Sequence, residues 1–180
     1  MNTIAANTDK VLTGFGQAAK WTKIEGQPDR MDVENIFDHS VDCLSQIHTD
    51  QGGGQLGFTG LIYTKAEYLL LDLASAEFVS AVHPGALTIA DSATLALRDD
   101  TKIIHAQKLQ AFKLQRVVSQ AILVLMRGSI DEEYYEELKK PKQGYNGVTP
   151  IAFLEHLFTE YREKMEEMQT KKYATSADRP

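Results

Sequence analysis

The chain has 180 residues, of which 43% are apolar and 24% charged, the proportions of an ordinary globular protein. This length suits one well-buried domain and is too short for two ordinary ones. The formal net charge of −6 argues against nucleic-acid binding by this region alone, because neutralising phosphates requires a surplus of Lys and Arg on one face.

Residues 1–30 are weakly patterned and interrupted by glycine and proline, so we expect a partly flexible N-terminal arm. Its aromatic side chains Phe15 and Trp21 could still pack on the body. Apolar side chains then recur every three or four residues over 31–48, which predicts a helix with one buried stripe.

The stretch DQGGGQLGFTG at 50–60 contains five glycines and ends this helix. A phosphate-binding loop needs the spacing G-x-x-x-x-G-K-[ST] or G-x-G-x-x-G with a helix opening directly behind it. Neither spacing occurs, and the residues after Gly57 have the pattern of a short strand. We therefore interpret the stretch as a flexible connector.

Thr64 and Glu67 form a capping-box pattern, which predicts a short helix over 65–73. Residues 78–82 alternate between apolar and small side chains. Such a segment could pair with 58–63 in a small β-hairpin, and the His-Pro-Gly turn signal that follows would close it.

No glycine or proline interrupts 92–127, which is a long helical candidate. Its second half, 109–126, is apolar on nearly every side, so we expect it at the centre of the core. Ser129 and Glu132 form a second capping-box pattern and predict a short acidic helix over 130–138.

A last helix is predicted to begin at Pro150, because Thr149 supplies an N-cap and proline is well tolerated at the first helical position. Residues 171–180 are expected to form a disordered tail. The chain is therefore predicted to be mainly α, with a single helical domain of about five helices over 31–170.

These signals occur in an order that resembles a known family. The glycine run is followed by "GLIYTKAEY", "FVSAVHPGAL" and "AILVLMRGSIDEEYYEELKKPKQGYNGVTPIAFLEHLFTEY". This order resembles the N-terminal Gag-like region of copia-type LTR retrotransposons, in the versions abundant in diatoms and other algae, over about residues 24–168. The last block departs from the broad family in two ways: Pro150 replaces an alanine, and Phe153 or Leu154 stands near the usual tryptophan.

The resemblance implies the capsid part of Gag, a helical structural protein that self-associates through weak contacts into a particle around the element's RNA. It implies no enzymatic activity, no cofactor and no membrane contact. The chain would lie in the cytoplasm or inside virus-like particles. The zinc knuckle C-x2-C-x4-H-x4-C and the protease motif D-[ST]-G are both absent, so RNA binding is expected mainly from segments outside this sequence.

A second hypothesis belongs to a different class: a domesticated, monomeric helical module that binds other proteins and has lost assembly. A reading frame that continues past Pro180 into a second helical domain, a zinc knuckle or a protease would favour the capsid. A stop codon there would favour the module.

Few residues suggest chemistry. The spacing His39-x3-Cys43-x4-His48 has no fourth ligand nearby, so it predicts no closed zinc site. The sequence contains no G-x-S-x-G motif, the nucleophile elbow of many hydrolases, so it does not indicate a hydrolase. The acidic cluster at 131–137 could bind a divalent cation, but a run of acidic residues like this one is more often the solvent-exposed face of a helix. The single cysteine excludes an internal disulfide framework, and no apolar run reaches the roughly 18 residues that span a bilayer.

A weak basic stripe on the long helix is the one candidate nucleic-acid site. Two neighbouring acids, Asp99 and Asp100, and the overall negative charge oppose it. Its residues are Lys102, Lys108, Lys113 and Arg116.

Overall fold

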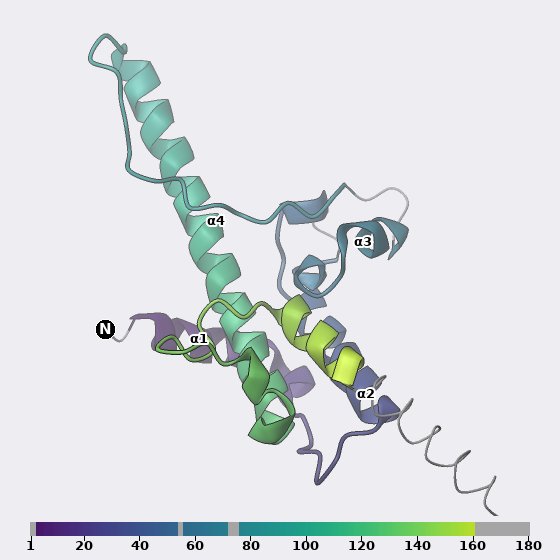
Figure 1. Cartoon of the computed structure of the whole chain (residues 1–180). Coiled ribbons are helices and arrows are strands. Elements are labelled where there is room, and N and C mark those ends of the chain that lie inside the picture. The colour runs from purple at the N-terminus through teal and green to yellow at the C-terminus, as the bar shows by residue number, and fades with distance from the viewer. Residues whose placement is uncertain (1–2, 54–55, 72–75, 161–180) are drawn as a thin grey trace, which may run out of the picture.

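A computed structural model describes residues 3–53, 56–71 and 76–160 of the chain (Figure 1). The labelled α-helices are α1 (Thr3–Gly14), α2 (Arg30–Ser45), α3 (Lys65–Leu71) and α4 (Leu95–Gly128). A further helix runs over 150–160. The predicted mainly α fold with about five helices is confirmed. The predicted tail at 171–180 and the last ten residues of the predicted domain lie outside the described residues.

Within the residues that the structure describes, five short 3-10 helices connect these elements. They are η1 (Gly16–Ala19), η2 (Gln51–Gly53), η3 (Thr59–Leu61), η4 (Glu132–Tyr134) and η5 (Glu136–Leu138).

Local capping signals set several helix ends. The amide of Thr64 donates to a Glu67 carboxylate oxygen at 2.9 Å, and the amide of Glu67 donates to the Thr64 hydroxyl at 3.3 Å, which confirms that capping box. The Thr149 hydroxyl accepts from the amide of Ala152 at 3.2 Å, as predicted for the last helix. A further capping box joins Asp29 and Asp32 at the start of α2.

The N-terminal segment, expected as a partly flexible arm at 1–30, contains α1 and η1, and α1 packs against α4. Phe15 is completely buried in the core. The amide of Ile24 donates to the carbonyl oxygen of Ser129 at 2.8 Å, so this segment also closes against the chain that follows α4. Its described part belongs to the body.

The predicted β-hairpin is wrong, since the described residues contain no strand and η3 lies within 58–63. Residues 78–82 have no regular secondary structure, and the amide of Ala81 donates to the side-chain oxygen of Gln115 on α4 at 2.7 Å. Phe78 packs its ring against Phe58, 6.4 Å between centroids. Val79 and Val82 are exposed, so Phe78 is the large apolar side chain of this segment that packs on the body, and the alternating pattern does not mark a strand.

The predicted acidic helix over 130–138 is also wrong, because η4 and η5 occupy this stretch as two separate 3-10 turns. The Ser129 hydroxyl does not cap a helix but donates to the carbonyl oxygen of Met126 at 2.8 Å. The Glu132 carboxylate accepts from Lys139 and from the Tyr145 hydroxyl. With both expected capping partners engaged elsewhere, no α-helix starts here.

The hydrophobic core surrounds the C-terminal third of α4. Buried side chains on α4 begin only at Val117, whereas Leu114 is 38% exposed, so the centre of the core is shorter than the predicted 109–126. Helix 150–160 contributes Phe153, Leu154 and Leu157 to this core, and α2 contributes a further stripe. The α2 stripe consists of Val33, Ile36, Cys43 and Leu44.

The described part of the glycine-rich stretch turns and packs closely, and no α-helix opens directly behind it, since α3 begins only at Lys65. Gly57 has a φ of +55°, a backbone conformation that residues other than glycine rarely adopt. A Cβ there would lie within 3.0 Å of three carbonyl oxygens at and just beyond the end of α2. A Cβ at Gly60 would collide with the ring of Phe78. These two glycines are needed for close packing, which a merely flexible connector would not require.

Replacing Gly57 by alanine is therefore expected to lower the free energy of unfolding by about 1–3 kcal/mol, the usual cost of a strained backbone position. Gly14 is the matched control, because a Cβ there meets no atom within 4 Å. Urea unfolding followed by circular dichroism measures both variants. Equal stability of Gly57→Ala and the parent would contradict the packing role.

Candidate functional site

The N-terminal half of α4 projects from the body, and residues 81–94 run beside it in the opposite direction (Figure 1). We call α4 residues 95–112 together with this strap the projecting arm. At its base the ring of His83 meets that of Phe112, 5.1 Å between centroids. Farther out, His105 Nε2 lies 3.1 Å from the carbonyl oxygen of Gly85.

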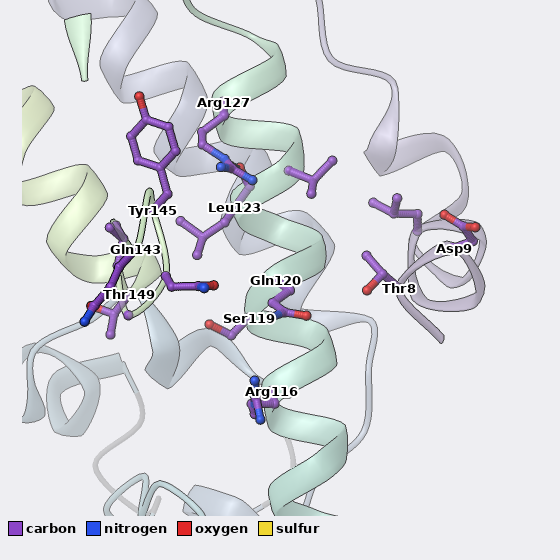
Figure 2. A pocket seen from close by; sticks show the side chains of 15 residues that line it. Thr8, Asp9, Arg116, Ser119, Gln120, Leu123, Arg127, Gln143, Tyr145 and Thr149 are labelled. Carbon is purple, nitrogen blue, oxygen red and sulfur yellow. Dashed lines mark hydrogen bonds between the residues drawn. The ribbon is translucent and has the colours of Figure 1, made fainter. Parts of the chain in front are cut away.

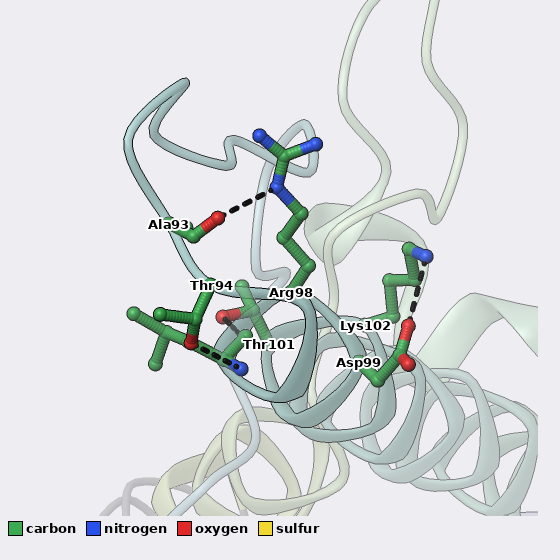
Figure 3. Close-up of polar contacts among 7 residues, drawn as sticks. Ala93, Thr94, Arg98, Asp99, Thr101 and Lys102 are labelled. Carbon is green, nitrogen blue, oxygen red and sulfur yellow. Dashed lines mark hydrogen bonds and ion pairs between the residues drawn. The ribbon is translucent and has the colours of Figure 1, made fainter.

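The tip of the projecting arm is held by hydrogen bonds (Figure 3). Arg98 donates from Nη2 to the carbonyl oxygen of Asp91 at 2.7 Å and from Nε to that of Ala93 at 3.0 Å. The Thr94 hydroxyl accepts from the amide of Leu97 and caps α4. One arginine therefore joins the end of the strap to the first turn of the helix.

The strap covers only one side of the helix. Arg98, His105 and Phe112 face it and are spaced seven residues apart, about two helical turns. Leu97 and Ile104 share the same spacing on a face turned by about 100°. Both are more than half exposed, at 55% and 51%. Ile103 and Leu95 are also exposed, so the projecting arm carries large apolar side chains in solvent.

Three of the four predicted basic residues lie on one side of α4. Lys113 is turned from Lys102 by about 20° and Arg116 by about 40°, whereas Lys108 lies about 120° away from Lys102. Lys102 forms an ion pair with Asp99 at 3.1 Å. Arg116 lies nearer the body and lines a groove between α1 and the loop at 143–149.

This groove has a volume of about 840 Å³. Arg116 and Arg127 lie at the two ends of its α4 floor (Figure 2). Asp9 of α1 lines the same groove, and the remaining polar side chains are uncharged. Two guanidinium groups could bind an extended anion, although Asp9 weakens that attraction.

The Arg127 end of the groove is already engaged within the chain. The Arg127 guanidinium carbon lies 5.2 Å from the ring centroid of Tyr145, whose hydroxyl donates to Glu132 at 2.7 Å. Partial burial and this hydrogen bond raise the pKa of Tyr145 to about 12. The hydroxyl therefore stays protonated at neutral pH. Arg127 and Glu132 both contact Tyr145, so these side chains stabilise the local structure rather than offer a binding site.

The three residues with metal-like spacing do not converge. Cys43 is completely buried, and its Sγ donates to the carbonyl oxygen of Ala18 at 3.2 Å. Burial raises the pKa of this thiol to about 11, which disfavours the thiolate that metals require. His39 packs near Trp21, and His48 is largely exposed beside Asp50.

A different group of metal-ligating side chains comes together in the part of the chain that the structure describes. Glu137 on η5 lies near His156 and Glu160 on helix 150–160. The spacing His156-x3-Glu160 places two of these ligands on one helix face and was available from the sequence. Their meeting with Glu137 depends on tertiary packing.

In comparisons with known proteins, no family model matches the chain, and no curated protein or solved structure matches it significantly. Among the described residues, no helix is long and apolar enough to cross a membrane. The geometry of the projecting arm, the groove and the ligand cluster is therefore the basis for any functional interpretation.

Proposed function

We propose that the chain is a structural protein that associates with itself. This is the function of the Gag-like capsid region that its sequence resembles. One observation carries this proposal: the projecting arm extends from the body with large apolar side chains in solvent. Leu95, Leu97, Ile103 and Ile104 are each at least 51% exposed. Leu97 and Ile104 lie two turns apart on one face of α4, and exposed apolar side chains grouped in this way are typical of an interaction site.

Burial of such side chains supplies the energy for association. Removing a leucine or isoleucine side chain from water stabilises a complex by about 1.5–3 kcal/mol before the costs of association are subtracted. A second copy of the chain offers the same arm and can provide a self-complementary contact of this kind. Each contact would be weak, and many copies would be needed for a particle.

The interaction module remains the competing function. An amphipathic helix from another protein could cover the same apolar face of α4. The two functions differ in the behaviour of the purified chain, because only the capsid function requires the chain to associate with itself. Electron microscopy of the purified protein over a range of salt and protein concentrations therefore tests the proposal directly.

Replacing both Leu97 and Ile104 by aspartate is expected to raise the dissociation constant for self-association at least ten-fold. Such a change would correspond to about 1.4 kcal/mol per contact. Both side chains are exposed, so the variant should keep its fold. Analytical ultracentrifugation measures the constant.

Met31→Asp is the matched control, because Met31 is 67% exposed on α2, outside the projecting arm. It should associate like the parent chain. A parent chain that stays monomeric at every concentration would favour the interaction module. Unchanged association of the Leu97→Asp, Ile104→Asp variant would place the interface elsewhere.

A further inference from the structure

Three potential metal ligands from two separate elements meet on one side of the body. Glu137 comes from η5, and His156 and Glu160 come from successive turns of helix 150–160. One ligand atom from each side chain lies within 4.8 Å of the other two. His156 and Glu160 are half-buried, whereas Glu137 is exposed.

The imidazole of His156 is held in place by the protein. Its Nε2 lies 3.0 Å from the carbonyl oxygen of Tyr134. When Nε2 carries the proton and donates to this carbonyl, Nδ1 keeps a free lone pair. A backbone carbonyl that accepts from the second ring nitrogen is the usual way in which proteins orient a histidine ligand.

The types of ligand favour a transition metal. Imidazole with two carboxylates suits Zn²⁺ and similar ions, while Ca²⁺ and Mg²⁺ prefer oxygen ligands alone. Zn²⁺ holds nitrogen and oxygen ligands at about 2.0–2.2 Å, so atoms bound to one ion lie roughly 3–4 Å apart. Small side-chain rotations would bring the three atoms into that range. A divalent cation would also neutralise the two carboxylates.

We propose that Glu137, His156 and Glu160 bind one Zn²⁺ ion, with water completing its coordination. The ion would join helix 150–160 to η5 and so fix the last described helix against the segment that follows α4. This inference does not depend on self-association, since all three ligands come from a single chain.

Calorimetric titration of the full chain with ZnCl2 tests the site. We expect one Zn²⁺ ion per chain and at least a ten-fold loss of affinity in His156→Ala. Glu160→Gln should also weaken binding, because it removes a ligand charge and keeps the shape of the side chain. Co²⁺ provides a second readout, since its visible absorption depends on the ligand set and should change when the imidazole is removed.

Two controls make the result specific. Glu136→Gln alters an exposed carboxylate on the same 3-10 turn, and His48→Ala removes a histidine whose side chain is 81% exposed. Both should bind Zn²⁺ like the parent chain. Should His156→Ala unfold, His156→Gln and Glu160→Gln decide the question.

Three outcomes would overturn the site. They are a parent chain that binds no Zn²⁺, affinity unchanged in both His156→Gln and Glu160→Gln, and loss of binding in His48→Ala.

Discussion

Replacing Ile122 by alanine is expected to lower the free energy of unfolding by about 2–5 kcal/mol, because the change leaves a cavity in a well-packed interior. Ile122 is completely buried, and it lies in the core cluster that also contains the buried side chains of α2. Neighbouring elements cannot all move inward to fill the space. With stabilities of about 5–15 kcal/mol usual for single domains, this one substitution removes a large share of the total.

Val124→Ala is the matched control on the same helix, since Val124 is 43% exposed. It should change the free energy of unfolding by less than about 1 kcal/mol, as surface substitutions usually do. Denaturant unfolding of both variants gives the comparison. Equal stabilities of the two variants would mean that α4 is not the centre of the core.

The helix ends were predictable where a cap is formed by neighbours in sequence. Two caps find their hydrogen-bond partners within a few residues: the one formed by Thr64 and Glu67, and the one formed by Thr149 before Pro150. The same pattern at Ser129 failed because Glu132 is engaged by Tyr145, thirteen residues farther on. A sequence pattern offers a capping partner but does not reveal which distant side chain competes for it.

The hairpin failed for a related reason. The alternation of apolar and small side chains at 78–82 predicts a segment with two different sides. It does not specify which residues those sides contact. The side chain of Gln115, 34 residues away from Ala81, accepts the backbone hydrogen bond that a strand would have given its neighbour. Partners this distant in sequence are fixed only by the folded chain.

The candidate sites were likewise predictable where their residues are close in sequence, and unpredictable where they depend on tertiary contacts. The seven-residue spacing of Leu97 and Ile104 can be found in the sequence, but their exposure depends on a strap that covers a different side of α4, turned from them by about 100°. The basic residues look like one group in the sequence, yet helical geometry turns Lys108 away from Lys102. Likewise, His156 and Glu160 are local neighbours, and Glu137 joins them only through packing.

Self-association through the projecting arm is expected to increase with added salt. The chain carries a formal net charge of −6, so copies repel one another as they approach. Salt shortens the range of this repulsion to about 8–10 Å at physiological strength and about 3 Å at 1 M. Burial of apolar side chains such as Leu97 and Ile104 is not weakened by this screening, so the balance shifts toward association.

Association driven by RNA has the opposite sign, because neutralising phosphates releases counterions and becomes weaker as salt rises. Light scattering from about 50 mM to 1 M salt, with and without added RNA, therefore separates the two. Growth of particles with salt in the absence of RNA is the expected result. Particles that require RNA and dissolve in salt would assign the assembly to basic residues such as Lys113 and Arg116. A monomer throughout would favour the interaction module, since the apolar face of α4 would then need a different protein to cover it.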